Sequence, residues 1–223
     1  MPDYYDKKLS ADRLKKVYDV APPRTRQYLQ AEIDFVLRYM NSEDKVLELG
    51  CGYGRVLKPL AEKVHSIAGI DSSQANIDAA QKYLSEFKNV DISLMNAIEL
   101  GFKDSTFSKV ICIQNGISAF HVDPTTLIKE AVRVTQAGGL VFFSSYSEKF
   151  WEDRLKWFKI QSEQNLIGKI DWENTRDGNL VCFDGFKATT FGRGDFESLM
   201  SHFDLPFKIY EINDSSLFCV IEI

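Results

Sequence analysis

The stretch Val46-Leu47-Glu48-Leu49-Gly50-Cys51-Gly52-Tyr53-Gly54-Arg55 decides the fold of this chain. A short apolar run that contains one acidic residue is followed by glycine at every second position. The apolar run predicts a buried strand, and the glycines predict a tight turn that opens a helix. Glycine adopts a positive φ without strain and lets a ligand approach main-chain N–H groups. A glycine-rich turn after a first parallel strand is where mononucleotide-type ligands bind in doubly wound α/β folds.

Strands and helices alternate along the chain after this turn. Further strands are predicted at residues 65–71, 90–95, 110–113 and 140–143. Amphipathic segments between them predict helices, and Gly138-Gly139 is expected to end the helix before the last of these strands. This alternation predicts a parallel sheet with right-handed crossovers. Residues 207–212 and 217–223 are two β-prone runs joined by four polar residues, so this last pair is expected to be an antiparallel hairpin.

Two segments stand outside the alternating pattern. Residues 1–41 read as two helices separated by a pair of prolines. Residues 148–192 read as an inserted α+β segment, with an aromatic-rich helix over about 148–160. A hairpin follows around the turn 176–179, and residues 186–191 are a candidate third strand. Because the whole chain has 223 residues, we expect a single domain over residues 1–223.

Composition narrows the possible functions. Hydrophobic residues make up 44% and charged residues 26% of the chain, which are ordinary values for a globular protein. The net charge of -5 disfavours a nucleic-acid partner or an anionic lipid surface. No signal-like segment and no apolar run of about 18 residues occurs, so no membrane partner is expected. The four cysteines are widely spaced, which predicts free thiols and a reducing, cytoplasmic location.

The second predicted strand ends at Asp71, about 20 residues after the glycine turn. A carboxylate at this place can accept hydrogen bonds from both hydroxyls of a ribose. The glycine spacing is GxGxG, whereas the dinucleotide fingerprint GxGxxG needs a small residue where this chain has Arg55. The two features together predict an adenosine-type ligand. The alternative is that the glycine turn has only a structural role and that Asp71 is a solvent-exposed acid at the end of a strand.

Four motifs together resemble one family, the class I S-adenosylmethionine-dependent methyltransferases of the small-molecule type. They are VLELGCGYGR (46–55), IAGIDSS (67–73), QNG (114–116) and AGG (137–139). The resemblance covers about residues 40–146 and the terminal hairpin. It implies an α/β fold with a doubly wound, seven-stranded, mostly parallel sheet and an antiparallel C-terminal hairpin. It also implies S-adenosyl-L-methionine as cofactor and S-adenosyl-L-homocysteine as product.

The resemblance also implies a set of cofactor-binding residues. They are Glu48, Gly50, Cys51, Gly52, Arg55, Asp71, Ser72, Asn96, Ala97, Gln114 and Asn115. In this family Asp71 would hold the ribose, and Asn96 with Ala97 would meet the adenine edge. Many members carry Asp where this chain has Asn96, whose amide can still bind adenine. Gln114 and Asn115 would lie near the sulfonium, and the first glycines beside the methionine part.

The sequence identifies the catalytic residue less clearly than the cofactor site. Transfer of a sulfonium methyl group needs a nucleophile held close and in line with the methyl group, and only some acceptors also need a base. His121 lies just beyond the fourth predicted strand and is the candidate base, since its free pKa is near 6.5. The alternative is a loop histidine packed over the next helix. His121 and Asp123 supply only two metal ligands, so no metal is expected. The motifs for exocyclic-amine and cytosine C5 methylation are absent after Cys112-Ile113.

These observations predict an S-adenosylmethionine-dependent methyltransferase that acts on O or N of a small-molecule acceptor. Family members often fold an N-terminal segment over the cofactor, so residues 1–41 are expected to form a lid. Residues 148–192 are expected to cap the acceptor side. The alternatives are a protein or RNA methyltransferase and a non-catalytic S-adenosylmethionine-binding or interaction protein. Arg55 and the terminal hairpin disfavour an NAD-dependent oxidoreductase. The oligomeric state is expected to be a monomer or a homodimer.

Overall fold

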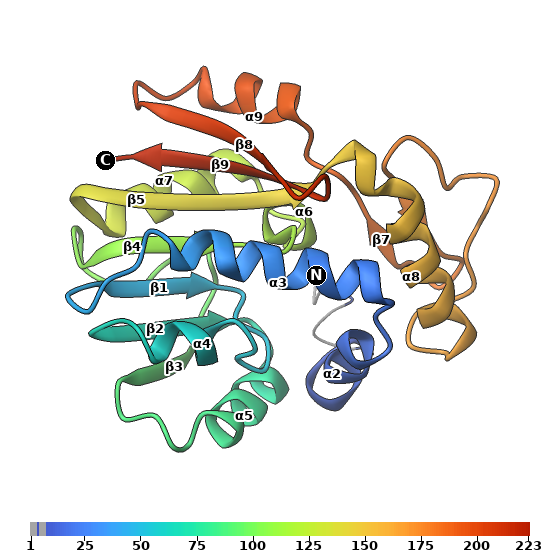
Figure 1. Cartoon of the computed structure of the whole chain (residues 1–223), viewed down its shortest axis with the longest axis horizontal. Coiled ribbons are helices and arrows are strands. Elements are labelled where there is room, and N and C mark those ends of the chain that lie inside the picture. Colours follow the sequence, from blue (N-terminus) through green and yellow to red (C-terminus); the bar gives the residue numbers. More distant parts are fainter. Residues whose placement is uncertain (1–3, 5–7) are drawn as a thin grey trace.

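The computed structural model describes residue 4 and residues 8–223, and its centre is one seven-stranded sheet (Figure 1). Its strands are β1 Lys45–Leu49, β2 Ser66–Asp71, β3 Val90–Leu94, β4 Phe107–Cys112, β5 Thr135–Tyr146, β8 Phe207–Ile212 and β9 Ser216–Glu222. The order is β3-β2-β1-β4-β5-β9-β8. Strands β1 to β5 pair in parallel, whereas β9 is antiparallel to both β5 and β8. The doubly wound sheet and the antiparallel hairpin predicted from the sequence are therefore confirmed.

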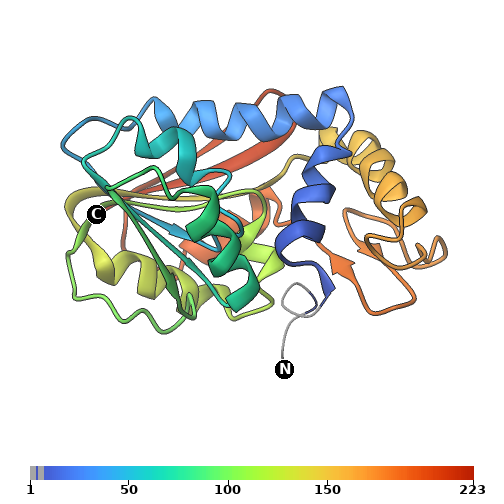
Figure 2. The same ribbon diagram turned by 90° about the horizontal axis from the view of Figure 1, so that it is seen from below.

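Helices cover both faces of this sheet. They are α2 Ala11–Asp19, α3 Pro23–Leu37, α4 Leu57–Ala61, α5 Gln74–Tyr83, α6 Gly116–Ala119, α7 Pro124–Val134, α8 Trp151–Glu163 and α9 Arg193–Met200, with a 3₁₀ turn at Glu148–Phe150. Figure 2 shows α3 and α4 on one side of the sheet and α7 on the other. Apolar side chains of α3 and α4 pack into one buried cluster, and those of α7 and α9 into a second. Burial of these two faces holds the layers together.

Strand β1 lies at the centre, between β2 and β4, and the chain changes direction across the sheet at this point. Ligands of open α/β sheets bind at such a switch point, outside the carboxyl ends of the strands. In Figure 1, α2, α8 and β7 lie at the right, beyond the ends of β1, β4 and β5. A third apolar cluster joins α2, the first turns of α3 and α8. The fold thus surrounds the switch point with segments from both ends of the chain.

The glycine pair Gly138-Gly139 does not end a helix, so this expectation was wrong. Helix α7 already ends at Val134, and β5 begins at Thr135. The pairing of β5 with β4 then shifts register, which makes an irregularity in the strand. Gly138 has a φ of +78° in this irregularity, and its N–H donates to the carbonyl of Ile223 at 2.6 Å. A left-handed backbone inside a strand is a position that glycine occupies without strain.

The inserted segment 148–192 differs in part from its expected form. The aromatic-rich helix is present as α8, and the turn at 176–179 closes with two backbone hydrogen bonds. The strand expected at Ile170 is reduced to a single bridge with Cys182. Strand β6 Leu180–Val181 pairs instead with β7 Lys187–Ala188, because Gly185 at φ +96° provides a tight turn between them. All four cysteines are buried free thiols, and no helix in the described part of the chain is long and apolar enough to cross a membrane.

Candidate active site

The glycine turn has the backbone conformation that its sequence predicts. Gly50, Gly52 and Gly54 have φ values of +74°, +53° and +90°. The N–H groups of Gly50 and Cys51 both donate to the carbonyl of Ile70, at 2.8 and 2.9 Å. The turn is therefore hydrogen-bonded to the end of β2. At these three positions a residue other than glycine would be strained, because the backbone is left-handed.

Two side chains lie so close to the turn that a methyl group would not fit there. A Cβ atom on Gly50 would lie 2.5 Å from the ring of Phe120. A Cβ atom on Gly52 would lie 2.9 Å from the side chain of Leu14 on α2. The N-terminal segment and the loop after β4 therefore both reach the backbone of the turn, and the glycines make this close approach possible.

Asp71 connects the turn to the neighbouring elements. Its Oδ2 accepts a hydrogen bond from the N–H of Gly52 at 2.9 Å. Its Oδ1 accepts from the N–H of Ser73 at 2.9 Å and from Nδ2 of Asn76 at 3.1 Å. Asn76 in turn accepts a hydrogen bond from the N–H of Ala11, at the start of α2. An ionised carboxylate has about four acceptor positions, so three donors leave room for a ligand hydroxyl.

A cavity of about 400 Å³ opens at the carboxyl ends of the central strands. All but one of the residues predicted to bind the cofactor line it: Glu48, Gly50, Cys51, Gly52, Arg55, Asp71, Ser72, Asn96, Ala97 and Gln114. They come from four loops that are far apart in the sequence. The parallel sheet brings these loops to one edge, since every parallel strand presents its carboxyl end there.

Asn115 and His121 lie outside the residues that line this cavity. Asn115 is buried and fastens the end of β4, because its Oδ1 accepts from the hydroxyl of Ser145 and its Nδ2 donates to the carbonyl of Thr189. His121 is exposed, with a φ of +51°, although its neighbour Phe120 lines the cavity. The structure thus places His121 beside the cavity rather than in it, and the predicted role as a base stays a prediction.

An acidic and a basic side chain face the cavity without a complete set of hydrogen-bond partners. Glu48 is buried at the end of β1, and its Oε2 has no hydrogen-bond partner in the described structure. Burial raises the pKa of Glu48 to about 8, and the positive charge of Arg55 opposes this rise. Nε and Nη2 of Arg55 are also buried and unpartnered, and its guanidinium lies 4.7 Å from the ring centroid of Tyr18. Such a pair fits a ligand that carries both an ammonium and a carboxylate.

Sequence reasoning missed Glu32, which is fully buried on α3. Its carboxylate accepts hydrogen bonds from the N–H of Gln114, at 2.7 Å, and from the hydroxyl of Ser216. Burial raises the pKa of Glu32 to about 7, although its hydrogen bonds favour the charged form. An acidic residue on the apolar face of a helix, between Leu29 and Ile33, is the sequence signal that points to it.

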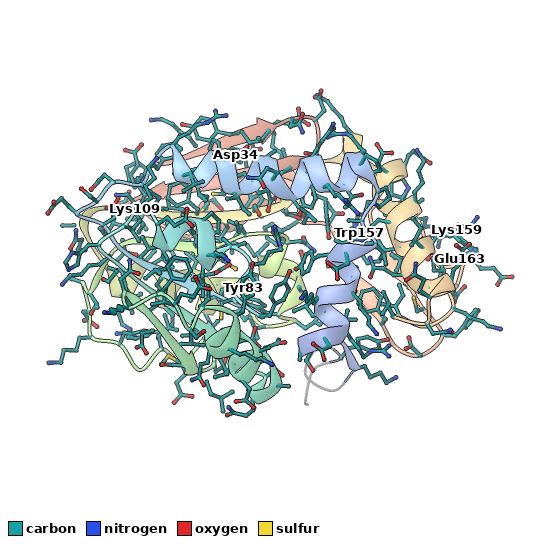
Figure 3. The ribbon with its side chains drawn as sticks, turned by 60° about the horizontal axis from the view of Figure 1, so that its bottom comes forward. Asp34, Tyr83, Lys109, Trp157, Lys159 and Glu163 are labelled. Atoms are coloured by element: carbon teal, nitrogen blue, oxygen red, sulfur yellow. The ribbon has the colours of Figure 1, made fainter. Side chains whose placement is uncertain are left out.

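The far end of the cavity is built by aromatic residues and one glutamine. They are Tyr28 of α3, Tyr146 of β5, Trp157, Phe158 and Gln161 of α8, and Phe186 before β7. Trp157 lies where α8 faces α2 (Figure 3), and its Nε1 donates to the carbonyl of Val17 at 3.0 Å. Trp157 and Phe158 of the inserted segment thus line the cavity, whereas Trp172 is 58% exposed. No group of three or more His, Cys, Asp or Glu suited to a metal occurs among residue 4 and residues 8–223.

Comparison with known proteins gives the family of the central region. Residues 46–139 match the family model described as a methyltransferase domain. A ubiquinone biosynthesis O-methyltransferase of Coxiella burnetii (strain RSA 493 / Nine Mile phase I) is 27% identical over 143 residues, which are 63% of this chain and 56% of that protein. One of Pseudomonas fluorescens (strain Pf0-1) is 33% identical over 104 residues, or 45% of this chain and 44% of that protein. The chain spans about half the length of the curated relatives it matches.

Solved structures show the same architecture over almost the whole chain. The PH0226 protein from Pyrococcus horikoshii OT3 aligns with a TM-score of 0.65 and 22% identity, over 98% of this chain and 97% of that one. A SAM dependent methyltransferase from Aquifex aeolicus aligns with a TM-score of 0.63 and 12% identity, over 93% and 96%. At these identities the likeness concerns the fold. Residues 46–139 therefore match a methyltransferase domain, and the chain has the class I, Rossmann-like fold of S-adenosylmethionine-dependent methyltransferases.

Proposed function

We propose that this chain transfers a methyl group from S-adenosylmethionine to an oxygen or nitrogen atom of a small-molecule acceptor. The observation that carries this proposal is one continuous cavity, in which the glycine turn and the aromatic residues of α3 and α8 both take part. Relatives named as ubiquinone biosynthesis O-methyltransferases support a small acceptor. The net charge of -5 argues against a nucleic-acid substrate.

The residues around the glycine turn fit the cofactor in chemical terms. Asp71 has acceptor capacity for a ribose hydroxyl, and Asn96 with Ala97 lines the cavity where the adenine would lie. The unpartnered atoms of Glu48 and Arg55 match the ammonium and the carboxylate of the methionine part. Binding of the cofactor would therefore satisfy buried polar groups that the protein alone leaves unpaired.

The chain's own contribution to the reaction is to position the reactants and to exclude water. When bound, the cofactor supplies a methyl group on a positively charged sulfur that is a good leaving group. The residues of the cavity then need to hold an acceptor atom in line with that methyl group. We assign a lid role to residues 1–41, since Leu14 contacts the turn at Gly52. We assign a cap role to residues 148–192, which supply Trp157 and Phe158 to the cavity.

Replacement of Asp71 tests the cofactor assignment. Asp71→Ala is expected to weaken binding of S-adenosylhomocysteine at least about tenfold, because the ribose loses a charged hydrogen-bond acceptor. The measurement is isothermal titration calorimetry, with circular dichroism to show that the variant is folded. Asp78→Ala is the matched control, since Asp78 is an exposed aspartate on the following helix α5.

Two results would contradict the proposal at different levels. Unchanged affinity in Asp71→Ala would remove the ribose assignment alone. Binding of NADH together with no binding of S-adenosylhomocysteine would refute the proposed activity and favour an oxidoreductase. Formation of S-adenosylhomocysteine from S-adenosylmethionine, followed over a panel of small acceptors, gives the direct measure of transfer.

A further inference from the structure

We propose that the methyl acceptor is an uncharged, planar ring compound, held by Tyr28 and Gln161 between the aromatic walls of the cavity. This inference rests on the proposed function and names the class of acceptor for the same site. Three observations carry it: rings with fixed positions, two buried polar groups without partners, and the location of the charged side chains.

The aromatic walls are held in place by their mutual contacts. The rings of Tyr28 and Tyr146 lie 5.4 Å apart between centroids, at an interplanar angle of 38°. Those of Trp157 and Phe158 lie 5.7 Å apart, and Phe158 lies 5.8 Å from Phe186. All five rings line the cavity and are buried. Walls built of aromatic rings favour a flat apolar body, because aromatic pairs gain energy from offset-stacked and edge-on contacts in addition to burial.

Two polar groups in this part of the cavity lack hydrogen-bond partners in the described structure. The hydroxyl of Tyr28 is one of them, on a side chain with no exposed surface. Nε2 of Gln161 is the other, on a side chain that is 1% exposed. A phenol hydroxyl can donate or accept, and a carboxamide offers both functions at its two ends. Since a buried polar group without a partner is unfavourable, a ligand with neutral hydroxyl, carbonyl or amine groups would satisfy both.

The charged side chains near the cavity lie either at the proposed cofactor site or behind the aromatic wall. In the described structure those that line the cavity are Glu48, Arg55 and Asp71, and all three belong to the proposed cofactor site. Arg154 is also buried behind the wall, with its guanidinium 4.0 Å from the ring centroid of Tyr146 and 5.4 Å from that of Phe158. It does not line the cavity, and its Nη1 and Nη2 donate to backbone carbonyls and a threonine hydroxyl. A carboxylate among the rings would therefore lose its hydration without a direct hydrogen bond from a cationic side chain that lines the cavity.

Binding of three matched probes to the protein with S-adenosylhomocysteine tests this inference. Benzamide is flat and neutral, benzoate is flat and anionic, and cyclohexanecarboxamide is neutral but puckered. Calorimetry is expected to give benzamide an affinity at least about tenfold higher than that of either other probe. Gln161→Leu should weaken benzamide binding about tenfold, because one hydrogen bond is lost. Gln164→Leu is the control, since Gln164 is an exposed glutamine at the end of the same helix.

A variant with a reversed ligand preference also tests the inference, because a protein that failed to fold could not show this reversal. Gln161→Lys places a cation at the same point and is expected to reverse the preference, so that benzoate binds more tightly than benzamide. Benzoate bound as tightly as benzamide by the wild type, or no binding of either ring, would overturn the inference. Both results are obtained with S-adenosylhomocysteine bound, so they leave the proposed function intact. Absence of S-adenosylhomocysteine binding would instead refute the proposed function.

Discussion

Replacement of Glu32 by glutamine is expected to change how the stability of the protein depends on pH. The carboxyl group of Glu32 is fully buried between α3 and the sheet. It accepts hydrogen bonds from Gln114 N–H and from the hydroxyl of Ser216. Glutamine has the same shape and no charge. Its carbonyl oxygen can accept from Gln114 and its amide can donate to the hydroxyl of Ser216, so it imitates the protonated acid.

The size of the effect follows from the pKa of Glu32. Burial raises this pKa from 4.5 to about 7. Between these two values the native state holds a proton that the unfolded state has released, so the free energy of unfolding falls as the pH rises. The stabilising contribution is complete below pH 4.5 and is lost as the pH passes 7. At about 1.4 kcal/mol for each pH unit, the loss is on the order of 3 kcal/mol.

Urea unfolding at several pH values between 4.5 and 8 measures this effect as the difference between wild type and Glu32→Gln. The variant should equal the wild type near pH 4.5 and exceed it by about 3 kcal/mol at pH 8. Glu48, whose pKa burial raises to about 8, is present in both proteins and cancels in the difference. Glu43→Gln is the control, since Glu43 lies in the exposed turn before β1. Its free energy of unfolding should differ from that of the wild type by the same amount at every pH. If the stability difference between wild type and Glu32→Gln also stayed constant from pH 4.5 to 8, Glu32 would be charged in the native protein over this range, and the reasoning would be refuted.

Two further predictions concern the cavity. Gly52→Ala should weaken S-adenosylhomocysteine binding about tenfold or more in calorimetry, because the residue has a φ of +53° and its new methyl group would press on Leu14. Gly101→Ala, where the nearest atom would be 3.5 Å away, should bind normally; equal affinities would contradict the strain argument. His121→Ala should keep turnover within about twofold, since the side chain is exposed and does not line the cavity. A drop of about hundredfold or more, with unchanged cofactor affinity, would instead establish His121 as the base.

The sequence by itself determined the glycine turn and its acidic partner. Gly50, Gly52 and Gly54 permit the left-handed backbone that the turn adopts, and Asp71 ends a strand that its own apolar pattern predicts. The alternation of strands with helices, and its absence before the terminal hairpin, likewise fixed the class of fold. These features depend on residues close together in the chain, where conformational preference and periodicity decide the structure.

Interactions between distant segments were decided only by the tertiary structure. Glu32 and Ser216 are 184 positions apart, and Asn115 reaches Thr189 over 74 positions. The sequence placed Asn115 at the cofactor, but packing turned its amide toward β5 and the inserted segment instead. Gln161 carries no motif, and it became a candidate acceptor contact only because α8 faces α2 and α3 across the cavity. Burial and hydrogen-bond partners depend on which segments meet in space, and no local pattern in the chain encodes that meeting.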